Sequence, residues 1–224
     1  MLPNNKESLK KEYYSWFNKN QPSGYKATIS NAIEAIYSIE HTGVVNDDDV
    51  MSLKAALALP PSLSLGKYCC YLALKHKSVE DLILTFSRHS LASIRFNTLL
   101  FCFYKEPQKM IDSMLKQGLN DRSKWVREKA IDIICRLNKT YLKSDLSQRL
   151  ESEKNTEIQQ LLKTSYGLLE KGYALDLHRK NHLTIQLSNG GQTSIDISAV
   201  DLNDPMTLAK LEEEIDEIRG QYEK

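Results

Sequence analysis

Residues that make turns are scarce in this sequence, which has only nine glycines and six prolines among 224 residues. Because an all-β chain needs such residues at its many turns, their scarcity favours a helical protein. The sequence also has no excess of positive or negative charge, since thirty basic residues stand against twenty-nine acidic ones. A dedicated nucleic-acid binder usually carries a basic excess that replaces the counterions of phosphates. The balanced charge therefore weighs against nucleic acid as the partner, although a local basic patch is compatible with it.

Long apolar runs are absent too. No stretch reaches the roughly 18 apolar residues of a membrane-spanning helix, and the first residues lack the apolar region of a signal peptide. The four cysteines lie in apolar, helix-like runs without a CxxC spacing, so we expect buried free thiols and no disulfide framework. These features predict a cytoplasmic protein that does not associate with membranes. The cysteines are Cys69, Cys70, Cys102 and Cys135.

Motifs that carry chemistry are also missing, because the sequence contains no P-loop, GxGxxG, HExxH or GxSxG. His178 and His182 are four residues apart, but they straddle an expected helix-to-strand change and no third ligand is suggested nearby. The acidic run 47–49 is better explained as the first turn of a helix than as a cation site. We therefore expect no catalytic residue, no metal and no cofactor.

Apolar residues at helical spacing predict helices over 7–18, 25–41 and 47–59. Gly43 marks the end of the second helix, and the Pro60-Pro61 pair marks the end of the third. We expect the helices within 1–45 to form an N-terminal cap on the helical pairs that follow.

A repeat with a period of thirty-two residues dominates the next part of the chain. Such a period is typical of a solenoid, because one helix pair cannot bury both of its apolar faces and stacks on the next pair. We expect the pairs over 47–76, 79–105, 106–139 and 140–171. The matched residues are Val79, Leu82 and Ile83 with Ile111, Met114 and Leu115; Met110 and Met114 with Leu142 and Leu146; Ile94 with Val126 and Ile158; and Arg95 with Arg127 and Gln159.

The stretch 121–130, DRSKWVREKA, resembles a HEAT repeat, a unit of armadillo-type α-solenoids. Asp121, Val126, Arg127 and Ala130 occupy four places that the family favours. The flanking repeats are degenerate, and the resemblance covers about residues 79–171. It implies a mainly α fold, an α-α superhelix over 1–172. The corresponding residues are His89, Ile94, Arg95 and Thr98 before this stretch, and Glu153, Ile158, Gln159 and Leu162 after it.

The resemblance also implies a structural role for two of these residues. In the family, the aspartate and the arginine bond between successive repeats as a ladder, which is the role we expect for Asp121 and Arg127. Contact of Arg127 with a ligand is the alternative. His89 and Gln159 stand at the equivalent places, which implies a weaker or interrupted ladder.

The pattern changes in the segment 173–224. Alternating apolar and polar residues over 182–188 and 193–197 flank Asn189-Gly190-Gly191, which predicts a β-hairpin. A lone hairpin is marginally stable, so we expect its apolar face to pack on the last solenoid helix as a cap; an edge strand that pairs with a partner is the alternative.

Asp204-Pro205 then opens a final helix with an apolar stripe and an acidic face. We expect the stripe to dock on the protein and the acidic face to meet solvent. The alternative is a coiled-coil or partner-docking helix, for which under three heptads are available. The stripe comprises Leu208, Leu211, Ile215 and Ile218.

The first functional hypothesis is a non-catalytic protein-binding module, such as a bacterial immunity protein that neutralises a toxin, or a small regulator. Its concave face would be lined by the inner helices. A homo-oligomer joined through the hairpin or the final helix is a further alternative. The expected contact residues are Arg95, Trp125, Arg127, Lys129 and Lys163.

The second hypothesis is a nucleic-acid-binding protein or a DNA glycosylase for alkylated bases. Some bacterial glycosylases of this kind are built from HEAT-like pairs and use tryptophans, basic residues and an aspartate. Trp125, Arg127 and Asp132 lie on one expected helix and would be the counterparts. Aromatic and cationic groups together suit base stacking and phosphate contact.

Overall fold

The computed structural model describes residues 6–16, 24–59, 63–104, 106–175, 181–187, 191–201 and 203–221. Within these ranges the protein is mainly helical and carries one small antiparallel sheet, which confirms the expected fold class at that level. No helix in the described ranges is long and apolar enough to cross a membrane. His178, Pro60-Pro61 and Asn189-Gly190 fall outside the described residues.

Two compact units make up the chain, residues 1–118 and 119–224. The division falls at the C-terminal end of a helix within the segment 1–172, for which the sequence predicts one continuous array. The site residues expected from the sequence are therefore distributed over two units, with Arg95 in the first and the others in the second.

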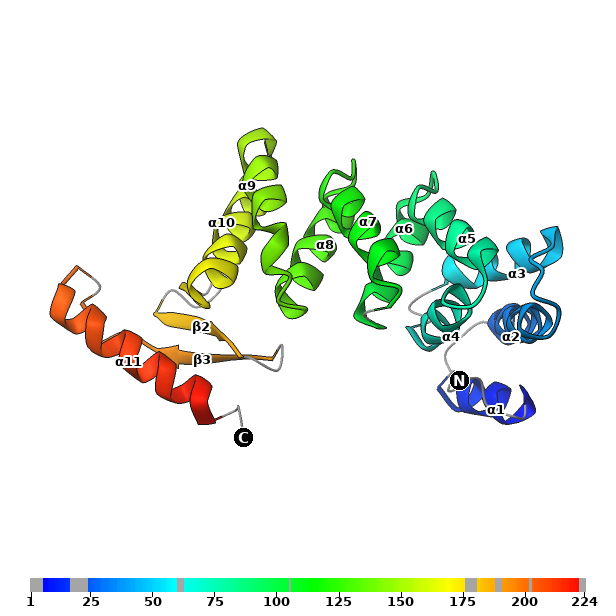
Figure 1. Ribbon diagram of the computed structural model, residues 1–224, viewed down its shortest axis with the longest axis horizontal. Coiled ribbons are helices and arrows are strands. Elements are labelled where there is room, and N and C mark those ends of the chain that lie inside the picture. The colour runs from blue at the N-terminus through cyan, green and yellow to red at the C-terminus, as the bar shows by residue number, and fades with distance from the viewer. Residues whose placement is uncertain are drawn as a thin grey trace. The chain divides into compact units, whose positions relative to one another are not determined.

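The described part of the first unit consists of helices (Figure 1). Helix α3 packs chiefly on α2, and α4 packs equally on α5 and η1, which differs from the expected pairing of the two helices within 47–76. Helix α5 also packs on α6, in agreement with the pair expected over 79–105. The elements are α1 (Lys6–Trp16), α2 (Gly24–Thr42), α3 (Asp47–Leu57), α4 (Leu63–Ala73), α5 (Lys77–Ser87), α6 (Ala92–Leu99), the 3-10 helix η1 (Leu100–Tyr104) and α7 (Gln108–Leu119).

Local chemistry explains why α2 ends and α3 begins where they do. Gly43 takes a φ of 70°, a left-handed conformation that suits glycine, and its N–H donates to the carbonyl of Ile39 at 2.8 Å. Asn46 then caps α3: its side chain accepts from the N–H of Asp49 at 2.9 Å, and the Asp49 carboxylate accepts from the N–H of Asn46 at 3.1 Å. The acidic run 47–49 thus forms the first turn of α3, where negative charge is favourable.

The second unit combines helices with the sheet (Figure 1). Helix α10 packs on both α8 and α9, and its C-terminal part contacts β1. The strand order is β1-β2-β3, with both neighbouring pairs antiparallel. The elements are α8 (Lys124–Arg136), η2 (Thr140–Leu142), α9 (Lys143–Ser152), α10 (Thr156–Lys171), β1 (Tyr173–Leu175), β2 (His182–Gln186), β3 (Gln192–Asp196) and α11 (Pro205–Gln221).

The predicted hairpin exists as β2 and β3, and a third strand, β1, which was not expected, pairs with β2 and makes the sheet three-stranded. The sheet contacts α10 through β1 and β2, as expected of a cap on the last helix pair. Its buried apolar cluster, however, is formed with α11, because the apolar stripe of that helix covers the apolar face of the sheet. The buried cluster that joins them consists of Leu183, Ile185, Ile197, Leu211 and Ile215.

Gly172 lets the chain turn from α10 directly into β1, because its φ of 78° ends the helix in a left-handed conformation. Arg219 of α11 lies over this glycine, and its Nη2 donates to the carbonyl of Lys171 at 3.0 Å. A Cβ at position 172 would lie 1.4 Å from that nitrogen, so a larger residue here would displace the end of the arginine side chain. The final helix is therefore anchored to the end of α10.

Candidate functional site

Three side chains that stand thirty-two residues apart make the same hydrogen bond. Each lies near the start of a helix and donates to the main-chain carbonyl of the residue six positions earlier, in the preceding turn. The repeat at these positions therefore has a structural cause, because the side chains tie the turn to the helix that follows it. The pairs are Arg95 with His89 (2.7 Å), Arg127 with Asp121 (2.9 Å) and Gln159 with Glu153 (2.6 Å).

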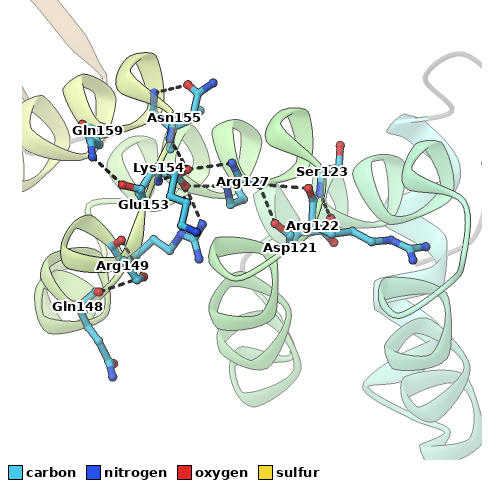
Figure 2. A network of polar contacts seen from close by, with 12 residues as sticks. Asp121, Arg122, Ser123, Arg127, Gln148, Arg149, Glu153, Lys154, Asn155 and Gln159 are labelled. Atoms are coloured by element: carbon cyan, nitrogen blue, oxygen red, sulfur yellow. Dashed lines mark hydrogen bonds and ion pairs between the residues drawn. The ribbon is translucent and has the colours of Figure 1, made fainter.

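Arg127 is also bound to Glu153 by two hydrogen bonds, from Nε to Oε2 at 2.8 Å and from Nη2 to Oε1 at 3.1 Å (Figure 2). Glu153 further accepts from Arg149 at 2.7 Å and from the main-chain N–H of Asn155 at 2.9 Å. Burial alone would raise the pKa of Glu153, but these donors lower it to about 2. The carboxylate is thus ionised and fully occupied in holding α8 to the turn between α9 and α10.

The contact between Asp121 and Arg127 goes through the main chain of the aspartate. The carboxylate of Asp121 accepts from the N–H of Ser123 at 2.7 Å and so shapes the turn before α8. The hydrogen bond that links α8 to the turn between α9 and α10 runs from Arg127 to Glu153, which lies thirty-two residues after Asp121. In this structure the acidic partner of the arginine is the residue of the following repeat.

Trp125, Lys129 and Lys163 reach the surface to different extents. Trp125 is 72% exposed at the start of α8. Lys129, one turn further on, is half-buried and donates to Asp132 at 2.9 Å. Lys163 is exposed on α10. Trp125 and Lys163 therefore remain available for contact, whereas Lys129 is already paired with Asp132.

Arg95 and Arg127, in contrast, are only 4% and 8% exposed. Their guanidinium groups bond to main-chain carbonyls in the preceding turns, and Arg127 adds the bonds to Glu153. Neither side chain lies on an accessible surface, so we do not retain them as contact residues. Because both arginines are buried and bonded to the preceding turn, their recurrence in the sequence is explained by a structural role.

One face of α8 carries an exposed aromatic ring among charged groups. At about 100° per residue, positions 125, 128, 129, 132 and 136 lie on the same side of the helix. Asp132 accepts from Lys129 at 2.9 Å and from Arg136 at 2.7 Å. Burial works to raise the pKa of Asp132, but the hydrogen bonds from Arg136 and Lys129 hold it below its usual value. We call this surface, formed by Trp125, Glu128, Lys129, Asp132 and Arg136, the α8 face.

Helix α10 neutralises one more cation beside the α8 face. Lys124, adjacent to Trp125, forms an ion pair with Glu157 of α10, and this partner lowers the pKa of Glu157. Glu128, by contrast, is exposed and has no ion-pair or hydrogen-bond partner among the described residues. The sequence identified Trp125 and Lys129 but missed Glu128, because only the three-dimensional pairing reveals which charges remain unpaired.

The residues that a glycosylase would use are not brought together. Trp125 and Asp132 share the α8 face, whereas Arg127 points to roughly the opposite side of the helix and is bound to Glu153. Asp132 is held between two cations of its own helix, which leaves it a poor base. The constellation for base excision is therefore not assembled in this structure.

The thiols are unsuited to nucleophilic chemistry as well. All four cysteines are free and buried. Burial raises the pKa of Cys69 to about 12 and that of Cys135 to about 11, and it raises the pKa of Cys70 further still. In the described part of the chain, no group of three histidine, cysteine or acidic side chains could hold a metal ion.

A pocket of about 280 Å³ lies where the end of α10 meets β2 and α11. Its walls include Asn138, Lys171, Gln186 and Arg219. Arg219 is already bonded to the Lys171 carbonyl, and Gln186 donates to the carbonyl of Gly191 at 3.1 Å. This pocket could not be predicted from the sequence, because its residues come from segments that are far apart in the chain.

Comparison of the chain with protein-family models, with curated proteins and with solved structures finds no match. The functional interpretation therefore depends on the geometry of the α8 face and its surroundings.

Proposed function

We propose that this protein is a non-catalytic protein-binding module of HEAT-like helical pairs, and that the α8 face makes the contact. The observation that carries this proposal is the 72% exposure of Trp125. A tryptophan ring left in water forgoes a large hydrophobic gain, and tryptophan is among the residues that contribute most to protein interfaces. Burial of this ring by a partner would recover that gain.

The repeat supports the HEAT-like part of the proposal. Ile94, Val126 and Ile158, which are thirty-two residues apart, are all 1% exposed. Each is followed directly by the side chain that bonds to the carbonyl six positions earlier. A core position and a polar position that recur together at one period are typical of stacked helical repeats.

The pairing of charges favours a protein over a nucleic acid on this surface. Phosphate binding depends on cations that exchange their mobile counterions for phosphate oxygens. Here Lys124, Lys129 and Arg136 are already paired with carboxylates of the chain. A phosphate brought to these cations would meet the same carboxylates, and its binding would be weakened by repulsion.

The test is capture of partners from the native lysate by the tagged protein, with and without nuclease, with mass spectrometry as the readout. Trp125→Ala is compared with Met206→Ala, which removes an equally exposed apolar side chain, also 72%, from the start of α11. We expect a stoichiometric protein partner that survives nuclease, is lost with Trp125→Ala and is retained with Met206→Ala.

Two results would contradict the proposal. A partner retained by Trp125→Ala would show that the α8 face is not the contact. Captured material that disappears on nuclease treatment would support nucleic acid as the partner and the second hypothesis.

A further inference from the structure

Three cations and three carboxylates lie around Trp125, and one of these carboxylates has no direct partner among the described residues. Lys124 is paired with Glu157, and Asp132 is shared by Lys129 and Arg136. These contacts leave Glu128 as the carboxylate of the α8 face without a partner in the described part of the chain. The exposed ring therefore stands beside an exposed carboxylate that no side chain of the described residues pairs with.

Glu128 is close enough to Trp125 to act with it. The two residues are three positions apart on α8, and side chains at this spacing are neighbours on a helix surface. A cation over the face of an indole ring is attracted by the ring's electron density, and tryptophan is the best of the aromatic side chains for this contact. A carboxylate one turn away supplies the matching negative charge.

We propose that Trp125 and Glu128 together receive an arginine or lysine side chain of the protein partner. This inference depends on the proposed function and names the chemistry that the partner presents. The cation stacks on the indole ring and pairs with the Glu128 carboxylate. An acidic side chain at the same place would be repelled by Glu128 and would find the neighbouring lysines already paired.

Arginine fits this site better than lysine. Its planar guanidinium lies flat on an aromatic ring and still directs N–H groups sideways to a carboxylate, and it is more weakly hydrated than an ammonium group. Among the described residues, the adjacent cations Lys124 and Lys129 do not compete for Glu128, because they are held by Glu157 and Asp132.

The experiment uses a random peptide library displayed on phage and selected on the immobilised full chain. Selections are run on the wild type, Trp125→Ala, Glu128→Lys and the control Glu213→Lys, which makes the same charge change at an exposed site on α11. We expect peptides selected on the wild type to be enriched in arginine or lysine at one position. That enrichment should vanish with Trp125→Ala, turn toward aspartate or glutamate with Glu128→Lys, and persist with Glu213→Lys.

A second measurement, of peptide affinity, quantifies how much the positive charge of the peptide contributes to binding. One selected arginine peptide is compared with its citrulline analogue, which keeps the shape and loses the charge. We expect the wild type to bind the arginine form about fivefold more tightly, and Glu128→Gln to reduce that preference.

The outcomes separate the inference from the proposed function. Selection without basic enrichment, or enrichment that Glu128→Lys leaves unchanged, overturns the inference, and the proposed function then stands if lysate capture still depends on Trp125. If lysate capture is also unaffected by Trp125→Ala, both proposals fail.

Discussion

Arg127 and Glu153, twenty-six residues apart in sequence, are joined by two hydrogen bonds of 2.8 and 3.1 Å between guanidinium and carboxylate. Their side chains are only 10% and 2% exposed. Removing one partner of a buried pair leaves the other charge uncompensated, which costs far more than the pair itself contributes. This contact should therefore be the most mutation-sensitive polar contact of the second unit.

Arg127→Lys should destabilise the second unit by about 2–3 kcal/mol, because an ammonium group cannot reproduce the fork to Glu153 together with the bonds to the carbonyls of Asp121 and Arg122. Amide hydrogen exchange should accelerate in α8, α9 and α10. The matched control is Arg136→Lys on the same helix, where the arginine is 60% exposed and pairs with Asp132. That change should cost less than about 0.5 kcal/mol. Equal effects of the two variants would contradict the structural role of Arg127.

The helices could be predicted from the sequence because their apolar residues follow the 3.6-residue period and their ends carry recognisable signals. The turn at Gly43 and the first turn of α3 are examples, and the apolar residues matched by the thirty-two-residue period are indeed buried. Strand β1 was missed because three residues are too few to reveal an alternating pattern, and its pairing depends on β2. The HEAT-like stacking of the pairs stays a proposal.

The site was less predictable than the fold. The sequence marks Trp125 and Lys129 as neighbours on one helix face, since that follows from spacing alone. It cannot tell that Arg127 faces inward, because the partner that draws it in, Glu153, lies twenty-six residues away. It also cannot tell that Glu128 is unpaired, because ion pairs such as Lys124 with Glu157 form only after folding.

Stability should fall in acid, partly through Glu153. Its native pKa of about 2 lies below the ordinary value of 4.5, so the unfolded chain binds the proton first as the pH falls. The contribution is therefore complete above about pH 5 and is lost progressively toward pH 2. Between pH 6 and pH 3 we expect a loss on the order of 2 kcal/mol from this group, measured as the free energy of unfolding in urea.

Glu153→Gln separates this contribution from that of other carboxylates, because glutamine does not titrate. The variant should be less stable than the wild type at pH 7, where it leaves the buried Arg127 without a counter-charge. Its stability should also change less between pH 6 and pH 3. A pH dependence identical to that of the wild type would show that Glu153 is not held ionised by its partners.

Gly66 of α4 should be intolerant of alanine, although alanine normally stabilises a helix by up to about 1 kcal/mol relative to glycine. A Cβ at this position would lie 2.3 Å from Cδ1 of Phe101, a residue that is only 1% exposed, so either the ring or the backbone of α4 would have to shift. We therefore expect Gly66→Ala to lower the free energy of unfolding by about 1–3 kcal/mol, measured in urea. Phe101→Leu in the same chain removes the ring atoms that clash, so the alanine should then be far less harmful than in the wild-type background. An alanine that stabilises the wild type would mean that α4 and η1 do not meet at Gly66.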